Sequence, residues 1–192
     1  MFIKIPKAGF TLAEVLVTLV VIGVVAALCI PALLENTNQA ELRASFKKSL
    51  SMLNQSLYMN YAQNATDTYT CCNTSGDNTA TGLTNFFANK LNTIAGPNGN
   101  VWFNTNDGMQ YTVTKFAAAN GCTASEPSDP SFANCVMLVD VNGAKPPNIM
   151  STGLGSLGTL TYKDQYQVVI RENAVIPASN ATSDVSVQAL EN

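Results

Sequence analysis

The chain begins with a long apolar stretch that contains one charge. From residue 9 to residue 34 the only charged side chain is Glu14. A helix needs roughly 20 apolar residues, at about 1.5 Å rise per residue, to cross a bilayer, and this stretch is long enough. Lys4 and Lys7 precede it, and no equal basic cluster follows closely. The positive-inside rule therefore predicts a cytoplasmic N-terminus and an exported remainder.

A secretory signal peptide is the main alternative for this stretch. Such signals have an apolar core of about 7 to 15 residues that ends in a small-x-small cleavage site. Here the small residues Ala8 and Gly9 come before the apolar stretch, so cleavage beside them would leave an anchor on the mature protein. Glu14 needs a partner, because a carboxylate within a membrane costs about 2.5 to 3.5 kcal/mol. The alternative is that Glu14 reaches the aqueous edge of the membrane.

A second pattern follows the apolar stretch and has the period of a helix. Large apolar residues recur at steps of three or four, which places them on one helical face: Leu42, Phe46, Leu50, Leu53, Leu57 and Tyr61. We therefore expect one helix from Phe10 to about Tyr61, with its second half packed on a sheet. Pro31 should bend or locally melt this helix, unless the membrane segment simply tolerates it.

The rest of the chain predicts short elements joined by polar loops. Residues 83–91 are expected to form a short helix, and residues 136–141 and 165–170 are the clearest strands. Residues 101–103 and 109–113 read as a hairpin around Asp107-Gly108, whereas the polar residues 177–192 are expected to be loosely held. The predicted fold class is α+β, with a long N-terminal helix on a small antiparallel sheet and a loop-rich head.

Composition lowers the expectation of catalysis. The chain has no histidine, which removes Ser-His-Asp and Cys-His nucleophile activation and imidazole metal sites. Its 10 Lys plus Arg are spread thinly against 13 Asp plus Glu, giving a formal net charge of −3. No direct contact with nucleic acid is therefore expected. A hydrolase using Asp140 and Asp164 as paired acids is the enzymatic alternative, but no further catalytic group accompanies them.

Four of the five cysteines lie in the part predicted to be exported, where disulfides persist. They are Cys71, Cys72, Cys122 and Cys135. A bond between adjacent cysteines is sterically unfavourable, so we expect Cys71 and Cys72 each to reach Cys122 or Cys135. A four-thiolate zinc site is the alternative, although its ligands usually come in spaced pairs. Cys29 reads as a small packing residue.

The N-terminal residues resemble the class III signal and helix of type IV pilins and type II secretion pseudopilins. The resemblance covers residues 4 to 34 and includes KAGFTLAEVLVTLVVIGVVAALCIPAL. It implies that prepilin peptidase cuts between Gly9 and Phe10 and methylates the new amine. It also implies that Glu14, the fifth mature residue, pairs with the Phe10 amine of a neighbouring subunit, and that Pro31 takes the position of the family's helix proline.

This resemblance implies an organisation and a function. Residues 1–9 would be a cleaved leader, 10–34 a transmembrane and assembly helix, 35–64 its amphipathic continuation and 65–192 the exported head. The protein would be a non-enzymatic pilin or minor pilin, held in the bacterial inner membrane and polymerised there with other copies by an assembly platform. The filament would be an extracellular pilus, or a periplasmic pseudopilus if the chain is a pseudopilin. A membrane-anchored binding module that never polymerises is the alternative from another class.

The segments VDVNGAKPPN and YKDQYQVVI resemble a C-terminal pattern of several pilin-like proteins. In them Asp140, Asn142 and Asp164 are candidate calcium ligands. Calcium takes about six to eight oxygens, and three side chains fall short of that number. Asn142-Gly143 alone is a sufficient turn signature, so the expectation is a structural turn without a cofactor, with calcium as the alternative.

Overall fold

The computed structural model describes residues 9–73, 79–117, 121–143, 145–146, 148, 164–179 and 190, without the side chains of 31–37, 39 and 73. The chain divides into two compact units, Met1–Asn38 and Gln39–Asn192, and each is described by itself. The predicted leader, apart from Gly9, and most of the connection between residues 144 and 163 lie outside the described residues.

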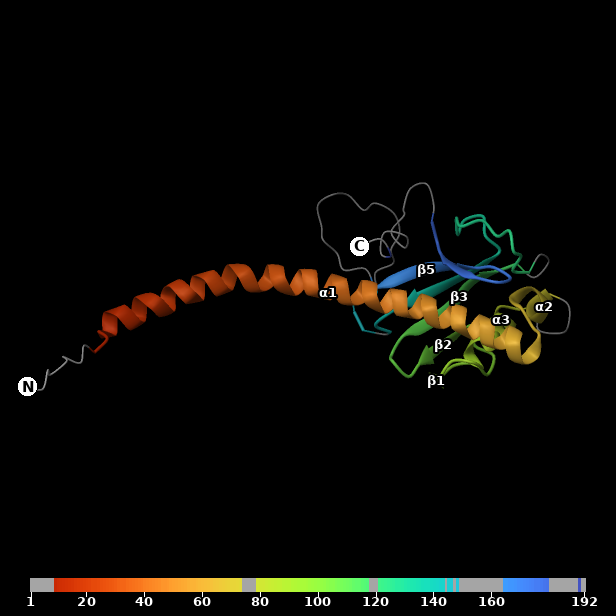
Figure 1. The fold of residues 1–192 in the computed structure, drawn as a ribbon, viewed down its shortest axis with the longest axis horizontal. Coiled ribbons are helices and arrows are strands. Elements are labelled where there is room, and N and C mark those ends of the chain that lie inside the picture. The colour runs from red at the N-terminus through yellow and green to blue at the C-terminus, as the bar shows by residue number, and fades with distance from the viewer. Residues whose placement is uncertain are drawn as a thin grey trace, which may run out of the picture. The chain divides into compact units, whose positions relative to one another are not determined.

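The described residues form three helices and one sheet (Figure 1). The helices are α1 (Leu12–Asn64), α2 (Thr68–Asn73) and α3 (Ala80–Ala88). The strands are β1 (Thr93–Ala95), β2 (Trp102–Thr105), β3 (Gln110–Phe116), β4 (Cys135–Asp140), β5 (Gln165–Ile170) and β6 (Val175–Pro177). All neighbours in the sheet are antiparallel, in the order β1-β2-β3-β4-β5-β6. The α+β class predicted from the sequence is confirmed.

The stronger strand signals are found in the structure. The predicted strand 165–170 is β5, and 136–141 differs from β4 by one residue at each end. The predicted hairpin is β2–β3, with Phe103 opposite Tyr111. Strands β1 and β6 were not predicted, because three residues carry no readable alternation. The prediction that the chain is loosely held from Pro177 onward is wrong at the start of that segment, since Pro177 ends β6 and Ala178 is buried.

The second half of α1 covers one face of the sheet. Phe46, Leu53 and Leu57 are fully or almost fully buried there, and Leu42 and Leu50 pack against the same core. The prediction for Tyr61 is wrong, because its side chain is 62% exposed. Asn60 takes the inward position instead and donates from Nδ2 to the carbonyl of Phe86 on α3, at 2.9 Å. Both positions border the same helical face, and this hydrogen bond satisfies the buried amide.

A side chain of α1 also closes one edge of the sheet. Asn54 Nδ2 donates to Val175 O and Asn54 Oδ1 accepts from Val175 N, both at 2.9 Å. These are the two backbone groups that a further strand would use at this position of β6. Asn54 therefore holds β6 to α1 and blocks pairing with another chain at this point.

The strands alternate between two apolar clusters. Tyr166, Val168 and Ile170 of β5 belong to the main core under α1, whereas Val169 belongs to a small cluster on the opposite face. That second cluster also contains Ala133, Val136 and Ala178. Its members come from β4, β5 and the segments next to Cys135 and Pro177, so the loop before β4 folds over the outer face of the sheet.

A buried carboxylate organises this loop. Glu126 is 1% exposed. Its Oε1 accepts hydrogen bonds from Thr123 N, Thr123 Oγ1 and Asn134 Nδ2, and its Oε2 accepts one from Asn134 N at 2.7 Å. Four donors offset the cost of burying the charge. Sequence analysis did not single out Glu126, since an isolated glutamate in a polar loop carries no signal of burial.

The predicted disulfide pairing is wrong. The two bonds are Cys71–Cys72, between neighbours, and Cys122–Cys135, with Cα atoms 5.5 Å apart. The hydrogen bond from Ala117 N to Asn134 O, beside the pairing of Phe116 with Cys135, folds the intervening loop back on itself. Cys122 therefore meets Cys135 across a short loop, and closing a short loop costs less chain entropy than bringing either cysteine to residues 71 and 72.

Candidate functional site

The N-terminal unit exposes an apolar helical surface. Helix α1 is long and apolar enough to cross a membrane over Leu12–Ile30, with a mean hydropathy of 2.7. None of that segment is buried within the structure. Ile22 is 64% exposed and Leu28 is 75% exposed, as examples of side chains along its whole length. Because so much apolar surface is unfavourable in water, this segment needs lipid or other protein chains around it.

Glu14 lies at the first turn of this helix and forms a capping box with Thr11. Glu14 Oε2 accepts hydrogen bonds from Thr11 N at 2.8 Å and from Thr11 Oγ1 at 2.9 Å, and Thr11 Oγ1 accepts one from Glu14 N at 3.3 Å. These bonds satisfy donors that a helix start leaves free. Sequence analysis missed Thr11, although a threonine followed three residues later by glutamate is a known capping signature.

The other predicted processing and assembly residues flank this turn. Gly9 and Phe10 precede the helix, and the Phe10 side chain is 89% exposed. No atom lies within 4 Å of where a Gly9 side chain would begin. The backbone of Pro31 is helical within α1, so the predicted local melting is not seen there. Phe10 and Glu14 thus lie near one exposed end of the helix, where another molecule can reach them.

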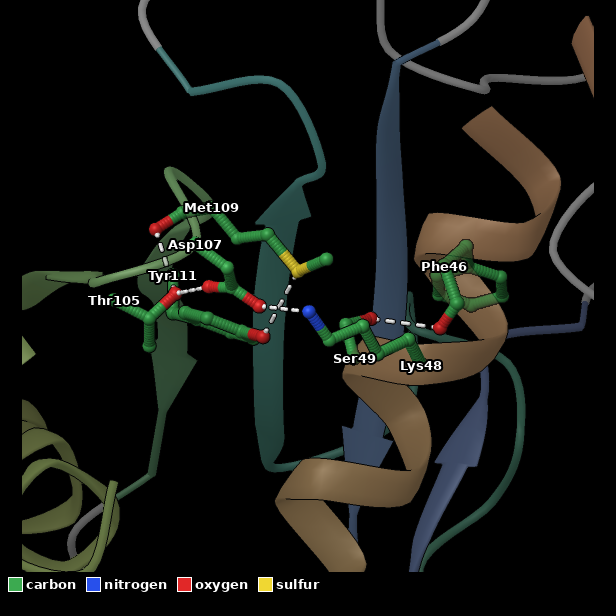
Figure 2. Close-up of polar contacts among 7 residues, drawn as sticks. All are labelled: Phe46, Lys48, Ser49, Thr105, Asp107, Met109 and Tyr111. Atoms are coloured by element: carbon green, nitrogen blue, oxygen red, sulfur yellow. Dashed lines mark hydrogen bonds and ion pairs between the residues drawn. The ribbon is translucent and has the colours of Figure 1, made fainter. Parts of the chain in front are cut away.

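On the head, α1 is joined to the β2–β3 hairpin by polar contacts (Figure 2). Lys48 Nζ lies 2.8 Å from Asp107 Oδ2, and Thr105 Oγ1 donates to Asp107 Oδ1. Burial raises the pKa of Asp107, but hydrogen bonds from Lys48 and Thr105 outweigh it and hold the pKa below its usual value. Asp107 therefore stays ionised and forms an ion pair with Lys48.

Tyr111 lies beneath this ion pair and is fully buried. Its hydroxyl is 3.4 Å from Met109 Sδ, and Figure 2 shows it between the hairpin and the helix. Burial raises the pKa of Tyr111 above its usual value, as does the nearby charge of Asp107, whereas a hydrogen bond with Ser49 lowers it in part. Its phenol therefore stays neutral and contributes to packing between the hairpin and the helix.

The predicted calcium candidates come together at the end of β4. Asp140 and Asp164 are 4% and 0% exposed. Asp140 Oδ2 accepts from Gln165 Nε2 at 2.9 Å and Asp164 Oδ2 accepts from Asn148 N at 2.7 Å. Burial raises the pKa of Asp140, hydrogen bonding to Gln165 opposes this, and the nearby charge of Asp164 raises the pKa further. The two acids are thus close enough to influence each other, as the sequence suggested.

Further oxygens surround these carboxylates. The side-chain amide of Asn148 has one terminal atom 3.0 Å from Asp140 Oδ2, 3.1 Å from Gly143 O and 3.2 Å from Lys145 O. The hydrogen-bonding pattern of the amide assigns nitrogen to that position, so its two N–H donors are shared among three oxygens that converge on one point. Asn142 Oδ1 is also buried and accepts no hydrogen bond from the residues that the structure describes. The carbonyls of Gly143 and Lys145 thus join the predicted side chains as candidate oxygen ligands.

Comparison with known families identifies the N-terminal unit. Residues 6–30 match the prokaryotic N-terminal methylation motif. This motif is the prepilin-type signature of type IV pilins and pseudopilins, and the predicted resemblance is confirmed. Searches among curated proteins and among solved structures gave no match.

The motif and the fold together define the class of protein. An apolar N-terminal helix, a small antiparallel sheet and disulfides make up an α+β fold of the pilin type. The chain therefore carries the N-terminal motif of pilin-like and pseudopilin proteins, and its apolar N-terminal helix has the features of a membrane anchor.

Proposed function

We propose that this protein is a subunit of a type IV pilus-like filament, as a pilin or minor pilin. The observation that carries the proposal is an exposed apolar helix with a carboxylate in its first turn, matched by the methylation motif. Prepilin peptidase would cleave between Gly9 and Phe10 at the cytoplasmic face of the inner membrane. The assembly platform would then add the subunit to a filament, with residues 65–192 exported as the head.

Glu14 has a specific part in this proposal. Cleavage creates an ammonium group on Phe10, four residues from the carboxylate of Glu14 in the chain. The two charges are costly to bury alone, but the Glu14 carboxylate of one subunit and the Phe10 ammonium of its neighbour become tolerable as a pair. Their pairing would set how far one helix slides along the next. Because Glu14 is also held by Thr11, its carboxylate is oriented before a neighbour arrives.

The test of processing is the mass of the mature N-terminus. The protein isolated from its host membrane should begin at Phe10, with one methyl group on the amine. A host without prepilin peptidase should yield a chain that still carries its leader, which is the matched control. A mature chain that begins after Cys29, or an intact Met1 in the presence of the peptidase, would contradict the proposal. Presence in sheared surface filaments would then separate a pilin from a pseudopilin.

We also propose that the turn after β4 holds a calcium ion. The support is that oxygens of Asp140, Gly143 and Lys145 converge on the side-chain amide of Asn148, and that Asn142 Oδ1 has no hydrogen-bond partner among the described residues. Asp164 supplies a second buried carboxylate. The ion would neutralise the two acids and hold the turn closed against the hairpin, where Gly143 leaves no room for a side chain beside Gly108 O.

Calcium should therefore raise the unfolding temperature of the full chain in mild detergent. At a concentration 100 times the dissociation constant, binding adds about 2.7 kcal/mol, which corresponds to a rise of roughly 5 to 10 °C. Asn148→Ala should abolish the rise, whereas Glu41→Gln, an exposed acid on α1, should keep it. An unchanged unfolding temperature at millimolar calcium would contradict the proposed calcium site.

A further inference from the structure

The bond between Cys71 and Cys72 differs from the other disulfide in its exposure. Cys71 is partly exposed at the surface of α2, while Cys72 is fully buried in the main core. Cys122 and Cys135 are both fully buried. A thiolate in solution can therefore reach one sulfur of the first bond, whereas both sulfurs of the second bond are covered.

The two bonds also differ in what they do for stability. A disulfide stabilises chiefly by restricting the unfolded chain, and the effect grows with the length of the closed loop. Cys122 and Cys135 are 13 positions apart, whereas Cys71 and Cys72 are neighbours. The bond between neighbours removes little freedom from the unfolded chain, so breaking it should cost the fold little.

Other contacts hold α2 in place without this bond. Asp67 Oδ1 accepts a hydrogen bond from Thr70 N at 2.5 Å, and the carbonyl of Asp67 accepts one from Cys71 N at 3.0 Å. Thr68 is fully buried and its Oγ1 donates to Arg171 O at 2.8 Å. The carbonyl of Thr68 lies 3.8 Å from Cys71 Sγ, where it can accept from a thiol. The helix can therefore keep its position when the two cysteines are reduced.

We propose that Cys71–Cys72 is a thiol-exchange site that an external dithiol opens while the folded head and the Cys122–Cys135 bond persist. A thiolate of the dithiol attacks Sγ of the partly exposed Cys71, the bond to Cys72 breaks, and Cys72 Sγ leaves with the electron pair and takes a proton. The second thiol of the dithiol then loses its proton and attacks the first sulfur of the dithiol, which is bonded to Cys71 in the mixed disulfide. This releases Cys71 Sγ, which takes a proton. Two electrons and two protons pass to the protein, and the dithiol becomes a disulfide.

The test is graded reduction of the folded full chain in mild detergent. A Cys29→Ser background removes the free cysteine, and dithiothreitol is the probe. After alkylation, peptide masses should show modified Cys71 and Cys72 at reductant concentrations at least tenfold below those that open Cys122–Cys135. Phenylarsine oxide, which bridges paired thiols, should bind one equivalent after reduction and none before.

Two double variants serve as controls for the exchange. Cys71→Ser with Cys72→Ser should remove the early alkylation and the arsenical binding while leaving the unfolding temperature within a few degrees. Cys122→Ser with Cys135→Ser should retain the early alkylation if it folds. The proposal is overturned if peptides from the unreduced protein lack a Cys71–Cys72 link, if both disulfides open together, or if Cys122–Cys135 opens first.

Discussion

Glu14→Ala should reduce the amount of this protein in sheared filaments at least tenfold. In the proposed filament, the substitution would leave the Phe10 ammonium of a neighbouring subunit without its partner, and an unpaired charge within the membrane costs about 2.5 to 3.5 kcal/mol. It also removes the acid from the apolar segment, so insertion into the membrane should improve rather than fail. Immunoblots of the sheared and membrane fractions measure both effects, and the variant should accumulate in the membrane.

Two further substitutions show which property of Glu14 matters. Thr18→Ala removes a polar group from the same segment, where Thr18 Oγ1 donates only to its own helix at Val15 O, and should assemble as the unaltered protein does. Thr11→Val removes the hydroxyl hydrogen bond that orients the Glu14 carboxylate and should have a smaller effect than Glu14→Ala. Assembly of Glu14→Ala to within twofold of normal would contradict the filament function and favour an anchored binding module.

Phe46→Ala should lower the free energy of unfolding of the head by about 4 kcal/mol. Phe46 is fully buried, and its ring stacks on Tyr166 with centroids 4.4 Å apart. Truncating a buried phenylalanine costs about 3 to 5 kcal/mol through lost burial and a residual cavity, and the lost aromatic contact adds to this. Urea unfolding of the full chain in mild detergent, followed by fluorescence of Trp102, the only tryptophan, measures the change.

Tyr61→Ala is the matched control for Phe46→Ala. Both residues are aromatic, both lie on α1, and both fit the same apolar period in the sequence, but Tyr61 is 62% exposed. Its truncation should change the free energy of unfolding by no more than about 0.5 kcal/mol. Equal losses for the two variants would mean that α1 packs on the sheet in a different rotation from the one described.

Sequence alone was sufficient for features that a short stretch of chain decides. The length and composition of the apolar stretch predicted a membrane-spanning segment, because solvation by lipid depends on local composition. The residues around Gly9 and Glu14 carried the resemblance that the methylation motif confirms. The helical period located most of the buried face of α1. The hairpin at Asp107-Gly108 was also readable, since turn geometry restricts which residues fit.

Features that join distant segments were decided by the tertiary structure. Nothing near Asn54 in the sequence indicates that its amide holds the edge of β6, since Val175 is its partner 121 residues away. Asn60, and not Tyr61, lies on the inward face of α1, where its side-chain amide donates a hydrogen bond to a carbonyl of α3. The side-chain amide of Asn148 also lies 3.0 Å from Asp140 Oδ2, and the sequence analysis did not select Asn148.

The cysteines show the same division between local and tertiary information. Their number and the predicted export of the segment that carries four of them predicted disulfides, because oxidation depends on compartment. Which cysteines pair depends on which sulfurs the folded chain brings within bonding distance, and the loop before β4 brings Cys122 to Cys135. The sequence thus determined the anchor, the periodic elements and the chemistry available. Folding decided which groups pair with one another. Such pairs depend on distances in the folded chain, and these distances cannot be read from positions along the sequence.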